Sequence, residues 1–193
     1  GKMITTGEGG ALFTKRKSDG KNARMYHDHG HKNIPNLPRG LDRAGMVGFN
    51  YRMTEISGAF GKVQLEKFPR ILRESKKRYR VLEKYIKHNE IKFRNVNKGN
   101  EPNYDTFVIS IENKKLRNRV ISLLHKTGFG TKNLPDAFNW HCAYFWEHFD
   151  KNIRNKEVTS CYDRLLNCVA IPILVSRPII DYKNIASYIN ECS

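Results

Sequence analysis

The chain has 193 residues, of which 39% are hydrophobic and 11% aromatic, and its formal net charge is +16. This composition excludes an intrinsically disordered protein, and the length suffices for one domain or two small ones. No apolar run approaches the ~20 residues of a membrane-spanning helix, and the first residues lack the apolar stretch of a signal peptide. The four cysteines show neither CxxC pairing nor the density of a disulfide scaffold. We therefore expect reduced thiols in a cytoplasmic protein without a membrane partner.

The positive charge raises the question of nucleic-acid binding. Lysines and arginines are spread along the chain and are dense only at residues 15–17 and 76–80. No RNA-recognition, zinc-finger or helix-turn-helix signature accompanies them. We expect a solvated basic surface and no nucleic-acid partner. A basic nucleic-acid-binding domain stays as the alternative, and salt-sensitive binding would favour it.

Residues 1–10 combine Lys2 with hydroxylated residues and a glycine-rich turn. Glycines can adopt positive φ and allow another group to approach the backbone closely. Residues 11–14 are predicted to form a short buried strand. From the residues alone, Lys2 is either a nucleophile that attacks carbonyls from a dry pocket or a solvated lysine before a turn.

The segment from residue 15 to residue 42 is rich in turn signals. Residues 15–22 are polar and contain Asp19-Gly20, residues 23–30 predict a short helix, and residues 33–42 predict an irregular loop. Three histidines alternate within residues 27–31. No cysteine or carboxylate follows them at a zinc-like spacing, so we interpret them as loop residues and predict no metal site.

Residues 53–67 predict a helix, because Met53, Ile56, Phe60 and Val63 recur at spacings of three and four. Gly58 and Gly61 weaken this helix but permit close packing against a neighbour. Pro69 is typical of the first turn of a helix, so a second helix is predicted from there to about residue 88.

The remainder of the chain predicts a small α/β domain. The expected order is a linker over 95–103, a strand over 104–111, a helix over 116–126, aromatic packing over 138–149, a helix over 158–166, an edge strand over 169–173 and a helix over 182–189 that Asp181 caps.

Two blocks of sequence resemble one enzyme family. Residues 2–10, Lys-Met-Ile-Thr-Thr-Gly-Glu-Gly-Gly, are similar to the segment with the pyridoxal-phosphate lysine in the DegT/DnrJ/EryC1/StrS sugar aminotransferases. Residues 48–56 resemble the Gly-x-Asn-x-Arg-Met-(Thr/Ser)-Glu segment of that family. Residues 27–40 most resemble one branch, the 8-amino-3,8-dideoxy-manno-octulosonate transaminases. The resemblance covers essentially this whole chain but only the C-terminal half of the family's length.

The resemblance implies an α/β fold, the C-terminal part of a fold-type I pyridoxal-phosphate-dependent transferase. Residues 1–67 would be the remainder of the large cofactor-binding domain, and residues 68–193 the small C-terminal domain. The implied reaction moves an amino group, from glutamate as donor, to a keto or aldehyde sugar for lipopolysaccharide or surface polysaccharide. The implied assembly is a homodimer with shared active sites.

The family's phosphate-binding turn, ring-stacking aromatic and pyridinium-binding aspartate all precede its lysine. We therefore expect these 193 residues alone to bind cofactor poorly and not to turn over. A non-catalytic remnant of the family is a further interpretation. Dehydratases of this fold carry histidine in place of the lysine, so Lys2 favours transamination.

The resemblance also assigns roles to the cofactor-binding residues. Lys2 would bind pyridoxal phosphate covalently and serve as general acid and base. Asn50 matches the residue that reaches across the dimer to the cofactor phosphate. Arg52 would contact substrate or phosphate, or form a structural ion pair with Glu55.

The remaining candidates concern the substrate. Glu8 is expected to fix its loop or contact substrate, and His29 falls in a segment that lies near the substrate in the family. Lys132 and His141 fall in the region that shapes the sugar pocket. The family's common His-Tyr-Pro run is missing from that region.

Overall fold

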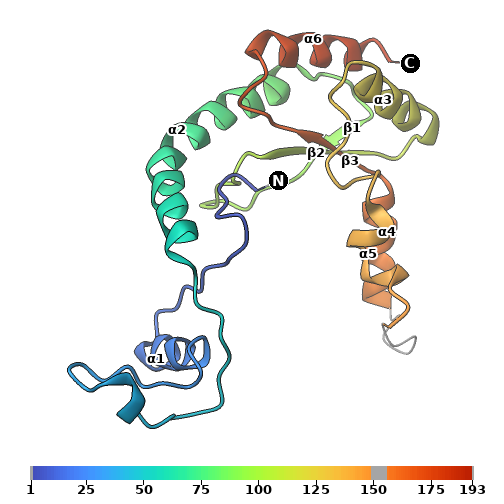
Figure 1. The fold of residues 1–193 in the computed structure, drawn as a ribbon. Coiled ribbons are helices and arrows are strands. Elements are labelled where there is room, and N and C mark those ends of the chain that lie inside the picture. Colours follow the sequence, from blue (N-terminus) through green and yellow to red (C-terminus); the bar gives the residue numbers. More distant parts are fainter. Residues whose placement is uncertain (1, 149–155, 193) are drawn as a thin grey trace. The chain divides into compact units, whose positions relative to one another are not determined.

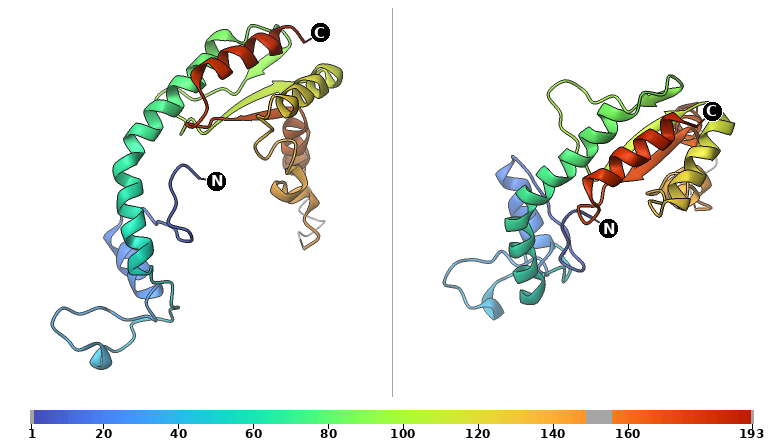
Figure 2. Two further views of the ribbon diagram at one scale, coloured as in Figure 1. Left: turned by 45° about the horizontal axis from the view of Figure 1, so that its top comes forward. Right: turned by 90° about the horizontal axis from the view of Figure 1, so that it is seen from above.

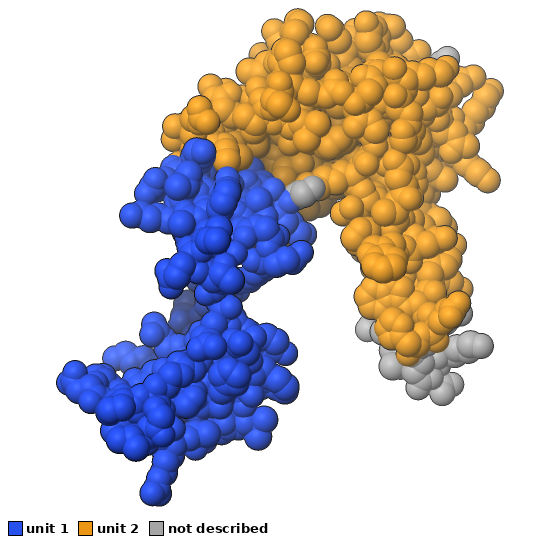
Figure 3. Space-filling model, in the orientation of Figure 1, with its two compact units in different colours: residues 1–68 blue, residues 69–193 orange. Residues whose placement is uncertain are grey.

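The structure is a computed structural model that describes residues 2–148 and 156–192, except for the side chains of residues 156–158 (Figure 1). The chain divides into two compact units, residues 1–68 and residues 69–193 (Figure 3). That these units correspond to the large and small domains of a transferase stays a prediction. Among the described residues, no helix is both long enough and apolar enough to cross a membrane.

In chain order, the elements of the described residues are α1 (Lys17–Tyr26), the 3-10 turn η1 (Arg39–Leu41), α2 (Glu55–Tyr85), β1 (Ile91–Phe93), β2 (Thr106–Ile111), α3 (Lys114–Lys126), α4 (Phe138–His141), the 3-10 turn η2 (Ala143–Phe145), α5 (Lys156–Leu166), β3 (Cys168–Pro172) and α6 (Ile179–Asn190).

Two predictions for the first unit are wrong. Residues 11–14 form no strand, and Phe13 is 93% exposed. The reason is that no neighbouring strand pairs with them in this unit. The first helix also begins earlier than predicted, since α1 includes Asp19 and Gly20. A carboxylate in the first turn of a helix favours this start, and Asp19 accepts a hydrogen bond from Arg16 Nε at 2.8 Å. The loop predicted over 33–42 is confirmed, apart from η1.

Helix α2 is one helix, not the two that were predicted. Pro69 lies inside it, where the missing N–H removes one backbone hydrogen bond. The predicted inward face of the following segment explains why the helix continues, because Tyr79 and Leu82 are buried in the core of the second unit. The predicted apolar face before Pro69 stays uncovered, since Ile56 is 74% and Phe60 is 62% exposed.

The second unit contains a three-stranded antiparallel sheet in the order β1-β2-β3. The alternation predicted for β2 is confirmed, because Phe107, Ile109 and Ile111 are buried while the residues between them are half-buried. β3 is an edge strand as predicted, and Pro172 lies opposite Thr106. The three-residue strand β1 was not predicted, because it is too short to show a period.

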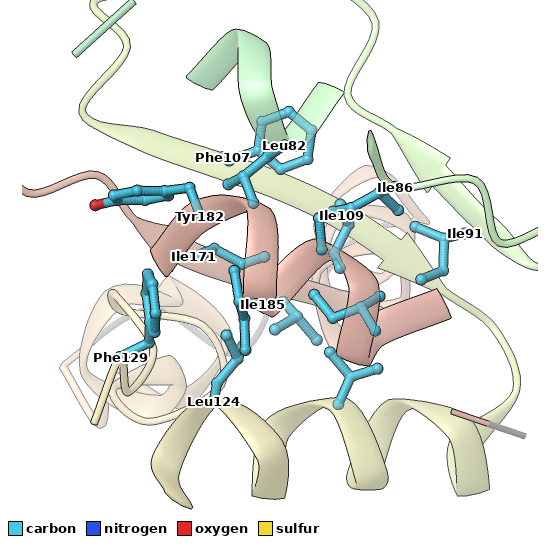
Figure 4. Close-up of a cluster of buried hydrophobic side chains, with 14 of the residues drawn as sticks. Leu82, Ile86, Ile91, Phe107, Ile109, Leu124, Phe129, Ile171, Tyr182 and Ile185 are labelled. Carbon is cyan, nitrogen blue, oxygen red and sulfur yellow. The ribbon is translucent and has the colours of Figure 1, made fainter. Parts of the chain in front are cut away.

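One face of this sheet carries the core of the second unit (Figure 4). Helices α3 and α6 and the end of α2 lie over that face (Figure 2). The predicted face of α3 is confirmed by the burial of Leu116, Val120 and Leu124. Asp181 is not the cap of α6. It lies in the first turn, because the helix begins two residues earlier, after Pro178.

The aromatic segment after α3 is packed as predicted over its described part. Phe138 stacks on Tyr162 of α5 with ring centroids 5.6 Å apart, and Tyr144 stacks on the same ring at 4.6 Å. Trp140 is 78% exposed and takes no part in this packing. Phe149 lies outside the described residues. The helix predicted over 158–166 is confirmed as α5.

Candidate active site

The segment that follows Lys2 is shaped by its own hydroxyl groups. Thr5 Oγ1 accepts the Gly7 N–H at 3.1 Å, and Thr6 Oγ1 donates to the Glu8 carbonyl at 2.8 Å. Gly7 has a φ of 83°, which side chains disfavour. The Thr-Thr-Gly sequence therefore specifies this turn through side-chain-to-backbone bonds.

The same segment lies against the first part of α2. A Cβ at Gly61 would be 3.1 Å from the methyl group of Thr6. A Cβ at Gly9 would be 3.0 Å from the terminal methyl of Met53. The predicted close packing is confirmed at Gly61 and is wrong at Gly58, where a Cβ would meet no atom within 4 Å. The structure thus brings the Lys2 segment into contact with the start of α2, just after the second block of the resemblance.

Lys2 and Glu8 are both exposed. Among the described residues, no side chain or carbonyl is paired with the Lys2 ammonium group or with the Glu8 carboxylate. Lys2 therefore offers a primary amine that is not held by an internal ion pair. The structure does not test the catalytic role of Lys2 or the substrate role of Glu8, and both stay predictions.

Asn50 is held by a short backbone ladder. Asp28 and Asn50 form an isolated antiparallel bridge, in which His29 N–H donates to the Phe49 carbonyl at 3.0 Å and Tyr51 N–H donates to the His27 carbonyl at 2.8 Å. The bonds flank the Asp28–Asn50 pair, so the two side chains lie on the same face at the closer of the two antiparallel spacings.

Glycine is required where the two segments of this ladder meet. A Cβ at Gly30 would lie 1.8 Å from the Met46 carbonyl oxygen, and a Cβ at Gly48 would lie 2.3 Å from the Gly30 nitrogen. Gly30 also has a φ of 84°. Any side chain at either position would push the two segments apart.

Asp28 is the charged centre of this ladder and is only 5% exposed. Arg39 donates to it through its two terminal nitrogens, Nη1 and Nη2, and Arg52 Nη1 lies 3.6 Å from Asp28 Oδ1. The hydrogen bonds from Arg39 lower the pKa of Asp28 to about 2, with further contributions from the charges of Arg39 and Arg52 and against the effect of burial. The predicted Arg52–Glu55 pair is wrong. Asp28 is the partner of Arg52, because the ladder places it on the same face.

The carboxamide of Asn50 is oriented by Arg52. Arg52 Nε lies 3.0 Å from Asn50 Oδ1. A guanidinium group only donates hydrogen bonds, so the carboxamide atom that faces it is the oxygen. Asn50 Nδ2 is left without an acceptor among the described residues, and Asn50 is exposed.

His29 follows Asp28 and stands in an unusual backbone conformation. Its φ is 54°, and its exposed ring lies 6.4 Å from the ring of His31 at a steep angle. His31 Nδ1 lies 3.8 Å from Asp42 Oδ2. Within residues 2–148 and 156–192, no group of three or more histidine, cysteine or acidic side chains is arranged to hold a metal ion.

Lys132 and His141 belong to the second unit. Lys132 Nζ donates to Asp105 Oδ2 at 2.7 Å, and its backbone N–H donates to the Ala170 carbonyl of β3 at 2.8 Å. His141 is the exposed last residue of α4. The structure therefore brings Asn50 and Arg52 together, but the roles proposed for Lys132 and His141 in a sugar pocket stay untested.

Sequence analysis missed three polar partners in these sites. Asp28 was seen only as part of a histidine-rich string, Arg39 only as part of an irregular loop, and Asp105 only as the start of a strand. The sequence did contain a signal for an ion pair at Asp28. An acidic residue in a loop must be paired or solvated, and Arg39 and Arg52 lie in the segments that follow it. The pairing itself depends on the ladder register, which the sequence does not display.

The donor set fits the phosphorylated aldehyde cofactor that the resemblance implies. Lys2 presents a primary amine that forms no ion pair within the described part of the chain, and Asn50 presents two N–H donors next to the positive Arg52. A primary amine suits the aldehyde group, and N–H donors beside a cation suit a phosphate. The chemistry of these residues therefore agrees with the implied cofactor.

Comparison with known proteins identifies the fold. Sugar aminotransferase CalS13 from Micromonospora echinospora matches 98% of this chain with a TM-score of 0.74 at 18% identity, over 49% of its own length. PseC of Helicobacter pylori, an aminotransferase involved in pseudoaminic acid biosynthesis, matches 99% with a TM-score of 0.72 at 17% identity, over 50% of its length. AtS13 from Actinomadura melliaura matches 98% with a TM-score of 0.75 at 17% identity, over 48% of its length.

The chain therefore spans about half the length of the solved structures that it matches. These likenesses confirm the expected fold, the C-terminal part of a pyridoxal-phosphate-dependent transferase of α/β class. A sequence model of the DegT/DnrJ/EryC1/StrS aminotransferase family matches residues 1–178. The chain belongs to the DegT/DnrJ/EryC1/StrS aminotransferase family.

Proposed function

We propose that this chain supplies the lysine-bearing half of a pyridoxal-phosphate-dependent sugar aminotransferase. The substrate would be a keto or aldehyde sugar destined for lipopolysaccharide or surface polysaccharide, with glutamate as amino donor. The protein would act in the cytoplasm as a homodimer with shared active sites, without a nucleic-acid or membrane partner. The single observation that carries the proposal is the unpaired Lys2 amine, in a turn that packs on α2 within a family match over residues 1–178.

The residues have distinct tasks in this proposal. Lys2 would bind the cofactor covalently and carry a proton at its Nζ, and Asn50 would donate to the phosphate of the partner subunit's cofactor. When bound, the cofactor supplies the electron sink for amino transfer. Glu8, His29, Lys132 and His141 would orient the sugar.

These residues make up only part of a site. Donors for the rest of the phosphate, a surface for the pyridine ring and an acid for its nitrogen are needed as well. Turnover is therefore proposed to require polypeptide beyond these 193 residues.

Covalent labelling tests the role of Lys2. The chain is mixed with substoichiometric pyridoxal phosphate, reduced with borohydride, digested and mapped by mass spectrometry, with absorbance followed from ~300 to 500 nm. We expect labelling of Lys2 in preference to Lys15, an exposed lysine of the same unit. Lys2→Ala should abolish the preferred label, and Lys15→Ala should leave it unchanged.

Equal labelling of Lys2 and Lys15 would overturn the proposal for this chain. Loss of the label in Lys15→Ala would also count against it. A label on Lys2 without amino transfer from glutamate would agree with the proposal, because turnover is proposed to need further site residues.

A further inference from the structure

The hydrogen bond and ion pair beside Asn50 point to a task for Arg52 and Asp28. We propose that Arg52 and Asp28 are positioning residues that hold the Asn50 carboxamide with both N–H donors available to a phosphate oxygen. The inference deepens the proposed function and rests on it, because the phosphate concerned is that of the cofactor. It concerns only the first unit.

Backbone register brings the three side chains together. Asp28 and Asn50 are opposite one another in the antiparallel bridge, on one face of the ladder. Residues two apart in an extended segment point to the same side, so Arg52 joins them on that face. The observed contacts agree, because Arg52 Nε donates to Asn50 Oδ1 at 3.0 Å while its Nη1 lies 3.6 Å from Asp28 Oδ1.

Arg52 orients Asn50 and is itself fixed in place by Asp28. Asp28 is 5% exposed and is fixed by two hydrogen bonds from Arg39, so it presents a stationary negative charge to Arg52. A guanidinium is planar and has its donors in a fixed fork. With Nη1 directed at Asp28, Nε is directed at Asn50, and the carboxamide cannot rotate without losing its hydrogen bond.

The charge beside Asn50 favours an anion. Arg39 binds Asp28 and is also near the charge of Asp42, so the positive group next to the Asn50 carboxamide is Arg52. If the Asn50 carboxamide were rotated by 180°, its oxygen would face the phosphate and repel it. The hydrogen bond from Arg52 therefore selects the orientation in which Asn50 donates.

A competing explanation is that Arg52 contacts the phosphate directly as a charge. Lysine separates the two explanations, because it keeps the charge but lacks the fork that joins Asp28 to Asn50. Under the positioning role, Arg52→Lys should behave like Arg52→Ala. Under the direct role, Arg52→Lys should retain most of the function.

The first experiment measures phosphate preference, defined as the ratio of Lys2 labelling by pyridoxal phosphate to Lys2 labelling by pyridoxal. Loss of a hydrogen bond to a charged group corresponds to a loss of about tenfold or more, so Asn50→Ala should lower the ratio by about tenfold. Arg52→Ala and Arg52→Lys should lower it to a similar extent. Arg43→Ala, which removes an exposed arginine of the same unit, should leave it unchanged.

Asp28→Asn and a double variant complete this set. Asp28→Asn should lower the phosphate preference by about threefold, because Arg52 loses its anchor but keeps its guanidinium. Adding Arg52→Ala to Asn50→Ala should cause no further loss, since the effect of Arg52 passes through Asn50. Labelling by pyridoxal should stay constant in Arg43→Ala, and each variant is compared with its own pyridoxal labelling, so that a general loss of structure does not alter the ratio.

The outcomes separate failure of this inference from failure of the proposed function. Absence of Lys2 labelling by both aldehydes would overturn the proposed function. Normal Lys2 labelling with a wild-type phosphate preference in Arg52→Lys would overturn the inference alone. An additive loss in the double variant would also overturn it.

A second measurement needs no cofactor. In the free chain, the 15N heteronuclear NOE of the Asn50 side-chain amide should be high, and that of the exposed Asn22 amide should be low. Arg52→Lys should reduce the Asn50 value to that of Asn22, and inorganic phosphate should shift the Asn50 amide protons only while Arg52 is present. Equal values for Asn50 and Asn22 in the wild-type chain would overturn the inference.

Discussion

The two units of this chain are stabilised by different physics. In the second unit, apolar side chains from a sheet and three helices fill a common core (Figure 4). In the first unit, Met25 is the one buried apolar side chain among the described residues, and Asp28 is the buried charged group. Burial of apolar surface is the dominant favourable term in folding. The second unit therefore has its own source of stability, whereas the first depends on a polar ladder.

The contrast also concerns function. Lys2 and Asn50, which are proposed to bind the cofactor, belong to the unit that lacks a core, and that unit leaves large apolar side chains such as Phe60 exposed. Exposed apolar side chains in number mark surfaces that are covered in a larger assembly. The chain spans about half the length of the solved structures that it matches.

The largest expected effect comes from two phenylalanines at opposite extremes of burial. Phe107 is 1% exposed in the second unit, and Phe13 is 93% exposed in the first. Phe107→Ala should lower the free energy of unfolding by ~3–5 kcal/mol, because it leaves a cavity in a packed core. Phe13→Ala should change it by less than about 0.5 kcal/mol.

Urea denaturation followed by circular dichroism measures both variants. A cost at Phe13 comparable to that at Phe107 would contradict the contrast between the units. It would mean that the first unit has a core that includes residue 13.

The next effect concerns Pro69, where α2 passes from one unit to the other. Pro69→Ala restores one backbone hydrogen bond inside a helix and should raise the free energy of unfolding by ~1–3 kcal/mol. The new amide at residue 69 should be protected from hydrogen exchange. Pro35→Ala, in the exposed loop of the first unit, should instead lower stability by about 0.4–1 kcal/mol. The same sign in both variants would contradict this expectation.

Local sequence patterns predicted the second unit better than the first. The alternation of Phe107, Ile109 and Ile111 and the spacing of Leu116, Val120 and Leu124 each identify a face that is buried in the structure. In the first unit the spacing of Ile56 and Phe60 predicted a helix correctly, but both side chains are exposed. Periodicity reports which side chains share a face, and it does not report whether anything covers that face.

In the candidate site, too, the sequence did not report which side chains lie in contact. The resemblance identified Asn50 and Arg52, yet the partner of Arg52 was wrong because Glu55 is near in sequence and Asp28 is near in space. A bridge between residues 28 and 50 depends on a loop closed by Gly30 and Gly48. Such a register cannot be inferred from residue spacing without knowing that the two segments pair.

A smaller effect should appear in the pH dependence of the first unit. The pKa of Asp28 is lowered from 3.8 to about 2 by Arg39, so the folded state favours its ionised form. This contribution to stability is present above about pH 4 and is lost as the pH falls towards 2. Protection of the His29 and Tyr51 amides, which close the ladder, should therefore decline over that range.

Asp28→Asn should have low protection of these amides at neutral pH and should lack the decline between pH 4 and 2. Asp19→Asn is the matched control, since Asp19 pairs with the exposed Arg16. Screening by water makes that pair weak. A decline that persists in Asp28→Asn would assign the pH dependence to another group.

The smallest effect comes from an ion pair in the unit that has a core. Lys132 and Asp105 are about three-quarters buried and 2.7 Å apart, whereas Lys92 and Glu112 form an exposed pair. Burial opposes ionisation of Asp105, but the hydrogen bond and charge of Lys132, together with hydrogen bonds that involve Thr106 and Asn103, lower the pKa of Asp105. Lys132→Ala should therefore cost about 1 kcal/mol, and Lys92→Ala should give no measurable change. Both costs lie well below that of Phe107→Ala, because an apolar core and not charge stabilises this unit. A loss in Lys132→Ala as large as in Phe107→Ala would show that the second unit, like the first, depends on a polar contact.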